Sequence, residues 1–168
     1  MEDFTSDIEY SPEFERAKSR AMTALNARAM SRGELRERLM QRGKNDGITE
    51  ETADAVVDWA ARLGLIDDLN YARELRRAYE RRGYGVGRVR QEFYRRRIPR
   101  ELWDEVLDGD DENAVPSALR FIEQKLGGAA ADYDTRRRIT AALARRGFTW
   151  DDVKAAFAAY EEQLTVDG

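Results

Sequence analysis

The sequence has 168 residues, of which 42% are apolar and 37% charged, with a formal net charge of -4 and neither histidine nor cysteine. This mix is typical of a folded domain or a short helical array, and it excludes a disordered chain. Because thiol nucleophiles, histidine-based triads and the usual zinc ligands are excluded as well, we expect a protein that is not an enzyme and that needs no cofactor or metal.

Helix start signals recur along the chain, and no segment alternates polar and apolar residues long enough to predict a sheet. Near the N-terminus, Ser11-Pro12-Glu13 places a capping serine before a proline that suits the first helical turn. Ser31-Arg32-Gly33-Glu34 has the spacing of a capping box, and Leu35 and Leu39 follow it. Further candidate starts are Thr49, Asp67 or Asp68, Pro99, Pro116, Asp134 and Thr149. The predicted fold class is all-α.

One pattern of residues occurs three times. Apolar residues four positions apart, followed by basic residues, lie in segments 35–43, 89–97 and 139–147. Each segment precedes an apolar residue and a helix start, and these pairs are spaced fifty residues apart, at Ile48-Thr49, Ile98-Pro99 and Phe148-Thr149. Since fifty helical residues have a marginal core alone, we predict three tandem three-helix repeats that pack on their neighbours as an elongated, curved array.

The repeat boundaries follow from these signals. We place an acidic N-terminal extension at 1–16, repeat 1 at 17–66, repeat 2, which is basic and ends in an acidic linker, at 67–113, and repeat 3 at 114–168. Leading helices are expected at 17–30, 68–82 and 114–126, and closing helices at 49–63, 99–107 and 149–164. Gly43 and Gly147 fit left-handed caps of the middle helices. Arg97 has the matching place in repeat 2, so that turn is either built differently or strained by about 1 kcal/mol.

Large apolar residues fall on stripes at helical spacing, which favours core packing over a binding surface. These residues are Phe14, Leu25, Leu35, Leu39, Val56, Leu63, Leu75, Phe93, Trp103, Phe121, Leu143, Val153 and Phe157. We expect Asp67, Asp68 and Tyr71, which follow the last helix of repeat 1, to hold the junction between repeats 1 and 2.

Arginine is concentrated in repeat 2. Between residues 73 and 100 eleven arginines stand against three acids, whereas residues 101–113 hold seven acids and no base. This segregation favours a surface for an anion or an acidic protein over a merely solvated helix face, and arginine adds bidentate recognition of phosphate or carboxylate. The candidate binding residues are Arg73, Arg76, Arg77, Arg81, Arg88, Arg90, Arg95 and Arg96.

Two segments resemble ligand-binding loops only superficially. The glycine-rich segment 83–87 lacks the third glycine of a dinucleotide motif and the Gly-Lys-Ser/Thr of a phosphate loop, so we interpret it as a flexible turn between helices. The acidic segment 108–112 lacks the central glycine and the closing glutamate of a calcium loop, and we interpret it as a linker. Neither segment predicts a nucleotide or a metal site.

Taken together, these segments resemble the RecX family, the bacterial regulators of the RecA recombinase. The resemblance covers residues 17–160. The stretches that carry it are Ser31-x-x-Glu34-Leu35-x-x-x-Leu39-x-x-Arg42-Gly43, Gly64-Leu65-Ile66-Asp67-Asp68-x-x-Tyr71-Ala72, Gly83-Tyr84-Gly85 before Val89-x-x-Glu92-Phe93, and Leu143-x-x-x-Gly147-Phe148. The chain departs from the family pattern at Val86, Phe93 and Arg97.

The resemblance implies a curved array that lies in the helical groove of the RecA filament on single-stranded DNA. Such a protein limits filament growth or promotes disassembly, and so lowers ATP hydrolysis, strand exchange and the SOS response in DNA repair. The candidate arginines would then contact the recombinase, and single-stranded DNA is a further possible partner. Groove binding needs only a monomer, which is the state that we expect.

Two alternatives remain from the residues themselves. Three-helix units with a basic middle helix also resemble helix-turn-helix proteins, so the chain is alternatively a stand-alone DNA-binding protein acting through repeat 2. An inert scaffold for another partner is the third interpretation. Under all three we expect a cytoplasmic protein with no membrane partner, since the chain has neither a secretory signal nor a long apolar segment.

Overall fold

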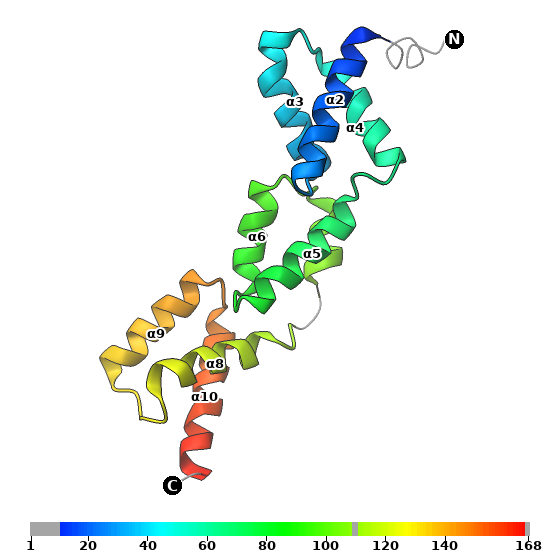
Figure 1. Cartoon of the computed structure of the whole chain (residues 1–168). Coiled ribbons are helices and arrows are strands. Elements are labelled where there is room, and N and C mark those ends of the chain that lie inside the picture. Colours follow the sequence, from blue (N-terminus) through cyan, green and yellow to red (C-terminus); the bar gives the residue numbers. More distant parts are fainter. Residues whose placement is uncertain (1–10, 109–110, 167–168) are drawn as a thin grey trace. The chain divides into compact units, whose positions relative to one another are not determined.

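The computed structural model describes residues 11–108 and 111–166, and every regular element in these ranges is an α-helix (Figure 1). In chain order the helices are α2 (Pro12–Ala27), α3 (Arg32–Asp46), α4 (Glu50–Arg62), α5 (Asp68–Arg81), α6 (Val86–Arg95), α7 (Glu101–Leu107), α8 (Ala114–Leu126), α9 (Tyr133–Arg145) and α10 (Trp150–Val166). They form three successive groups of three, which confirms the predicted all-α fold of tandem three-helix repeats. None of them is long and apolar enough to cross a membrane.

The contacts within the chain divide it into two compact units. The N-terminal unit runs to Ala72 and also contains Tyr94–Leu102, and the C-terminal unit contains Arg73–Phe93 and the chain from Trp103 onward. The division passes through α5, α6 and α7, so the residues of repeat 2 are shared between both units.

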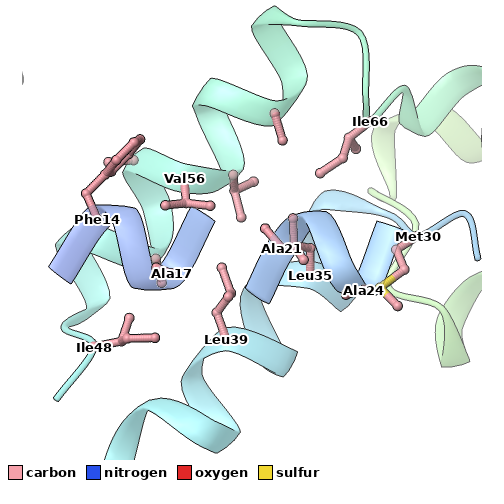
Figure 2. Packing of buried hydrophobic residues seen from close by; sticks show 14 residues of the cluster. Phe14, Ala17, Ala21, Ala24, Met30, Leu35, Leu39, Ile48, Val56 and Ile66 are labelled. Atoms are coloured by element: carbon pink, nitrogen blue, oxygen red, sulfur yellow. The ribbon is translucent and has the colours of Figure 1, made fainter. Parts of the chain in front are cut away.

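The core of the N-terminal unit lies between α2, α3 and α4 (Figure 2). The buried positions of α2 are mostly alanines, which let the neighbouring helices approach closely, and Phe14 packs edge-on against Trp59 of α4. From α3, Leu35 and Leu39 point into the same space, one helical turn apart, as their spacing predicts.

The core of the C-terminal unit has two parts. In one, α8, α9 and α10 enclose Ile122, Leu143 and Phe157, all of which are nearly inaccessible to solvent. In the other, Phe93 of α6 packs edge-on against Trp103 of α7, with their ring centroids 5.8 Å apart. The interpretation of the apolar stripes as core therefore holds for most positions. Leu63 is an exception, since it caps the end of α4 and is 60% exposed.

The helix starts follow the capping chemistry of the sequence. Ser11 accepts a hydrogen bond from the backbone of Phe14 at 3.1 Å, so α2 begins at Pro12, earlier than the leading helix was placed. The Ser31–Glu34 pair forms both bonds of a capping box, at 3.0 and 3.1 Å. Asp134 was the wrong cap for α9, because Asp132 caps that helix instead. Residues 1–10 of the predicted acidic extension lie outside the described residues.

The turns after the middle helices agree with two of three expectations. Gly147 is left-handed with a φ of 92°, as predicted. Arg97 adopts a φ of 52°, so the second repeat has the strained form of the same turn. Gly43 was the wrong residue in repeat 1, because α3 continues to Asp46 and Gly47 adopts the left-handed conformation, with a φ of 72°.

Candidate binding surface

The eight candidate arginines are divided between the two compact units. Six of them belong to the C-terminal unit, and Arg95 and Arg96 belong to the N-terminal unit. Their surroundings divide them further into paired, free and structural side chains.

Three of the arginines on α5 are neutralised by carboxylates. Arg73 Nη2 lies 2.9 Å from Glu105 of α7, and Arg77 Nη1 lies 2.9 Å from Glu74. Arg76 is half-buried, forms a 2.6 Å ion pair with Glu80 and also donates to the backbone carbonyl of Val106. Counting charges along the sequence missed the pair between Arg73 and Glu105, because Glu105 belongs to the acidic segment and returns to α5 through the fold.

Arg81 and Arg90 are exposed and form no ion pair with any described carboxylate. Arg88 is half-buried, and its Nη1 donates to Gln91 at 3.2 Å while its guanidinium lies 5.8 Å from the ring centre of Tyr84. Arg81, Arg88 and Arg90 therefore keep more of their charge available to a partner than Arg73, Arg76 and Arg77 do.

Arg96 has a structural environment in the N-terminal unit. Its Nη1 donates to the hydroxyl of Tyr71 at 2.8 Å, and its backbone carbonyl accepts a 2.6 Å bond from the buried hydroxyl of Ser31. Burial raises the pKa of the Tyr71 phenol, so Tyr71 remains a neutral partner for Arg96 at physiological pH.

The two aspartates expected at the junction have different tasks. Asp67 caps α5 by accepting from the backbone of Asn70 at 2.9 Å. Asp68 is 8% exposed, and its Oδ1 accepts from the backbone N–H of Arg32 at 2.9 Å, while its Oδ2 has no hydrogen-bond partner. Desolvation raises the pKa of Asp68. These contacts join the start of α3 to the start of α5, and the role of Asp67, Asp68 and Tyr71 as junction residues stays a prediction.

A second contact with the start of α3 comes from Arg97. Its guanidinium makes two hydrogen bonds to the Glu37 carboxylate, at 2.5 and 2.7 Å, and this pair lowers the pKa of Glu37. Gly33 lies against the same turn, where an added Cβ would stand 2.8 Å from the Cβ of Arg97. The close approach explains why glycine is present at the second position of α3.

The glycine-rich segment 83–87 joins α5 to α6 as expected, but it is also held against the turn between α9 and α10. Gly85 N–H donates to the carbonyl of Arg146 at 2.8 Å, and Gly87 N–H donates to the carbonyl of Gly147 at 3.0 Å. A Cβ on Gly85 would meet the Gly147 oxygen at 2.5 Å. The glycines therefore serve contact between two backbones, and the interpretation as a merely flexible turn was incomplete.

The structure also brings together a group of cations that the sequence did not reveal. A cleft of about 590 Å³ lies between the end of α5, the outer face of α8 and the turn before α10. Its charged lining is made of Arg81, Arg82, Arg120, Lys125, Arg146 and the single acid Glu80. Only Arg81 belongs to the predicted set, and Arg120, Lys125 and Arg146 come from segments 39 to 65 residues further along the chain.

Arg146 is held in this cleft between two aromatic rings. Its guanidinium carbon lies 5.3 Å from the ring centre of Tyr84 and 4.9 Å from that of Phe121. Arg82 lies 5.4 Å from the same Tyr84 ring, so several positive groups surround one tyrosine. Among the described residues no three His, Cys, Asp or Glu side chains come together as a metal site would require.

The helices and the contacts between them define a helical repeat protein. The start of the middle helix of one repeat packs against the left-handed turn of the next repeat. Family models match two of the repeats: the second three-helix domain of RecX matches residues 67–107, and the third matches residues 115–157. Relatives agree with these matches. The regulatory protein RecX of Halorhodospira halophila is 33% identical over 149 residues, which cover 88% of this chain and 90% of the relative.

A second relative, the regulatory protein RecX of Mycobacterium avium, is 32% identical over 142 residues, covering 80% of this chain and 79% of its own. The crystal structure of RecX from Lactobacillus salivarius superimposes with a TM-score of 0.78 at 17% identity, over 89% of this chain and 97% of that one. That likeness shows a shared fold. The chain belongs to the RecX family.

Proposed function

We propose that this protein is a non-enzymatic regulator that binds the RecA recombinase filament on single-stranded DNA, in its helical groove, and inhibits its assembly, ATPase and strand exchange in DNA repair and the SOS response. The observation that carries the proposal is the kinship with proteins named regulatory protein RecX over nearly the whole chain. A protein bound along a filament engages several subunits at once, which raises its effective affinity.

The ion pairs of the candidate arginines indicate which of them contribute most to this binding. Arg81 and Arg90 are exposed without carboxylate partners, so they supply the strongest contacts to an acidic filament surface. Arg73, Arg76 and Arg77 must exchange a carboxylate for the partner, which lowers their net gain. Arg88, Arg95 and Arg96 complete the proposed contact set.

The test is the ATPase rate of RecA on single-stranded DNA with and without an excess of this protein. We expect the wild-type protein to lower the rate. An Arg81→Glu/Arg90→Glu variant should lose much of this inhibition while keeping its helical circular dichroism, because neither side chain holds the fold. An unchanged ATPase rate with folded wild-type protein in excess would contradict the proposal.

Co-sedimentation with RecA filaments separates binding from inhibition. The matched control is Arg137→Glu/Arg138→Glu, which makes the same change of net charge on α9, where Arg137 is exposed and Arg138 bonds only to Thr135. The control variant should sediment with filaments like the wild type. If both variants lose binding equally, net charge and not the proposed surface governs the interaction.

A further inference from the structure

Several cations of the cleft between α5 and α8 lack counter-charges. Arg81, Arg120, Lys125 and Arg146 form no ion pair with a described carboxylate. The single acid of the lining, Glu80, is bound to Arg76 at 2.6 Å. The cleft therefore carries a concentrated positive charge that the protein itself does not neutralise.

Several arginines outside the cleft are neutralised by carboxylates of the protein. Arg36, Arg97 and Arg136 each lie within an ion pair, to Asp54, Glu37 and Glu161 respectively. The lining of the neighbouring cleft around Arg73 has more acids than cations, namely Glu80, Glu105, Asp111 and Glu112 against three arginines. A cleft with five cations and one acid, beside a cleft with more acids than cations, indicates a place where an outside anion completes the charge balance.

The geometry around Tyr84 shows how tightly the positive groups are gathered. The guanidinium carbons of Arg82, Arg88 and Arg146 lie 5.4, 5.8 and 5.3 Å from the centre of this one ring. Contact with the aromatic rings lowers the cost of bringing these charges together, and the guanidinium carbon of Arg146 also lies 4.9 Å from the ring centre of Phe121. The guanidinium plane of Arg146 is thus fixed before any ligand arrives, which reduces the entropy lost on binding.

We propose that this cleft binds the phosphate backbone of a nucleic acid strand. Arginine matches phosphate through paired N–H donors, and Arg120, which bonds only to Ser117 at 3.1 Å, is free to turn its donors outward. Lys125 adds a point charge one and a half helical turns further along α8. Ser117 and Gln124 supply neutral donors between these cations.

A nucleic acid strand fits this lining better than an acidic protein segment does. Protein interfaces depend on apolar and aromatic anchors that enter dry pockets. Here Phe121 is the sole large apolar side chain of the lining, and Lys125 and Arg146 already cover it. A strand of regularly spaced phosphates needs no such anchor, because release of its counterions drives binding.

This inference goes beyond the proposed regulation of the recombinase, since binding of a strand to the cleft needs no other protein. The test is fluorescence anisotropy of a labelled oligothymidylate, and of a duplex of equal length, titrated with the full chain at several salt concentrations. We expect binding at low salt that weakens steeply as salt is added, with a slope of about -0.7 for each phosphate contacted on the single strand.

The decisive variant is Arg120→Gln/Lys125→Gln, which removes two exposed cations of the cleft. Its salt slope should be shallower by about 1.4, the effect of two lost contacts, and its affinity at low salt should fall at least about tenfold. The matched control Arg137→Gln/Arg138→Gln removes the same charge outside the cleft and should bind like the wild type. Dependence on Arg120 and Lys125 with either nucleic acid supports the proposal, and comparing the two strands identifies the source of the phosphates.

Three results would overturn the proposal. The first is absence of nucleic acid binding at low salt, and the second is equal weakening of binding in the variant and its control. The third is that the protein binds polyglutamate through Arg120 and Lys125 but does not bind nucleic acid. The last result would assign the cleft to an acidic protein. The ATPase test of the recombinase runs independently. A protein that inhibits RecA yet binds no nucleic acid would refute the cleft proposal and leave the proposed function standing.

Discussion

At the scale of single residues, Asp68 is the most exceptional side chain in the N-terminal unit. It is buried, one of its oxygens accepts from the Arg32 backbone and the other has no partner. A carboxylate in such a place loses hydration that one hydrogen bond does not replace. Its pKa is consequently raised in the folded protein.

The direction of that shift makes a prediction about pH. Because the folded state binds the Asp68 proton more tightly than the unfolded state, this group adds stability as the pH falls from neutrality toward its ordinary pKa and loses it as the pH rises. Asp68→Asn keeps an oxygen for Arg32 and removes the charge. In urea unfolding, the variant should equal or exceed the wild type at pH 7, and its advantage should shrink as the pH falls toward the ordinary pKa of an aspartate.

The control for that experiment is Asp68→Ala, which also removes the acceptor for the Arg32 N–H. It should destabilise the protein by about 1–3 kcal/mol, the cost of an unpaired buried donor. If the asparagine and alanine variants are equally unstable at pH 7, the charge of Asp68 is needed for the fold and the pH argument is wrong.

At the scale of elements, most of the helices could be predicted because their signals are local. The caps at Ser11, Ser31 and Thr49 lie within three residues of the groups that they bind, so the sequence displays them directly. The left-handed turn at Gly147 is likewise local. The end of α3 was placed wrongly at Gly43, because a second glycine, Gly47, follows four residues later and takes the left-handed conformation.

Two capping boxes allow the local and the long-range contribution of one helix start to be separated. Ser31 and Thr149 both cap their helices reciprocally, with Glu34 and Asp152, but Ser31 Oγ also donates to the carbonyl of Arg96. Thr149→Ala should cost about 1 kcal/mol, the usual value of a cap. Ser31→Ala should cost about 1 kcal/mol more in denaturant unfolding, because it also leaves that carbonyl unpaired. Equal losses would mean that the bond to Arg96 contributes nothing to stability.

The candidate binding surface was less predictable than the helices. Charge counting identified repeat 2 correctly as rich in arginine, yet it could not show that Glu105 folds back onto Arg73. It also missed Arg120, Lys125 and Arg146, because only the fold brings α8 and the turn before α10 next to the end of α5. Proximity between distant segments arises only when the chain packs, so the spacing of residues in the sequence cannot predict it.

At the scale of the whole molecule, the same contact connects successive repeats. We call it the joint: the start of a middle helix packs against the left-handed turn of the next repeat. Within the N-terminal unit, Gly33 at the start of α3 lies against Arg97, and within the C-terminal unit, Gly87 at the start of α6 lies against Gly147. In both places the backbone carbonyl of the residue before the left-handed position, Arg96 or Arg146, accepts a hydrogen bond from the start of the helix. Repetition of the sequence thus reflects repetition of a joint as well as of a core.

The joint between repeats 2 and 3 can be tested with a matched pair of glycines. Gly147 and Gly128 have nearly equal φ values, 92° and 89°, but a Cβ on Gly147 would lie 2.2 Å from Arg88 N whereas one on Gly128 would meet nothing within 4 Å. Gly128→Ala should therefore cost about 1–2 kcal/mol from backbone strain alone. Gly147→Ala should cost clearly more in thermal unfolding, and equal losses would show that the close approach is dispensable.

The joint also bears on whether one molecule can add to the end of another through the same contact. The second residue of the middle helix is glycine in α3 and α6, at Gly33 and Gly87, but in α9 it is Asp134. A turn arriving from another molecule would meet a Cβ and an exposed carboxylate there, where the two internal joints require a bare backbone. We therefore expect that this protein does not grow head-to-tail through its own joint, so raising its concentration should yield no open-ended polymers.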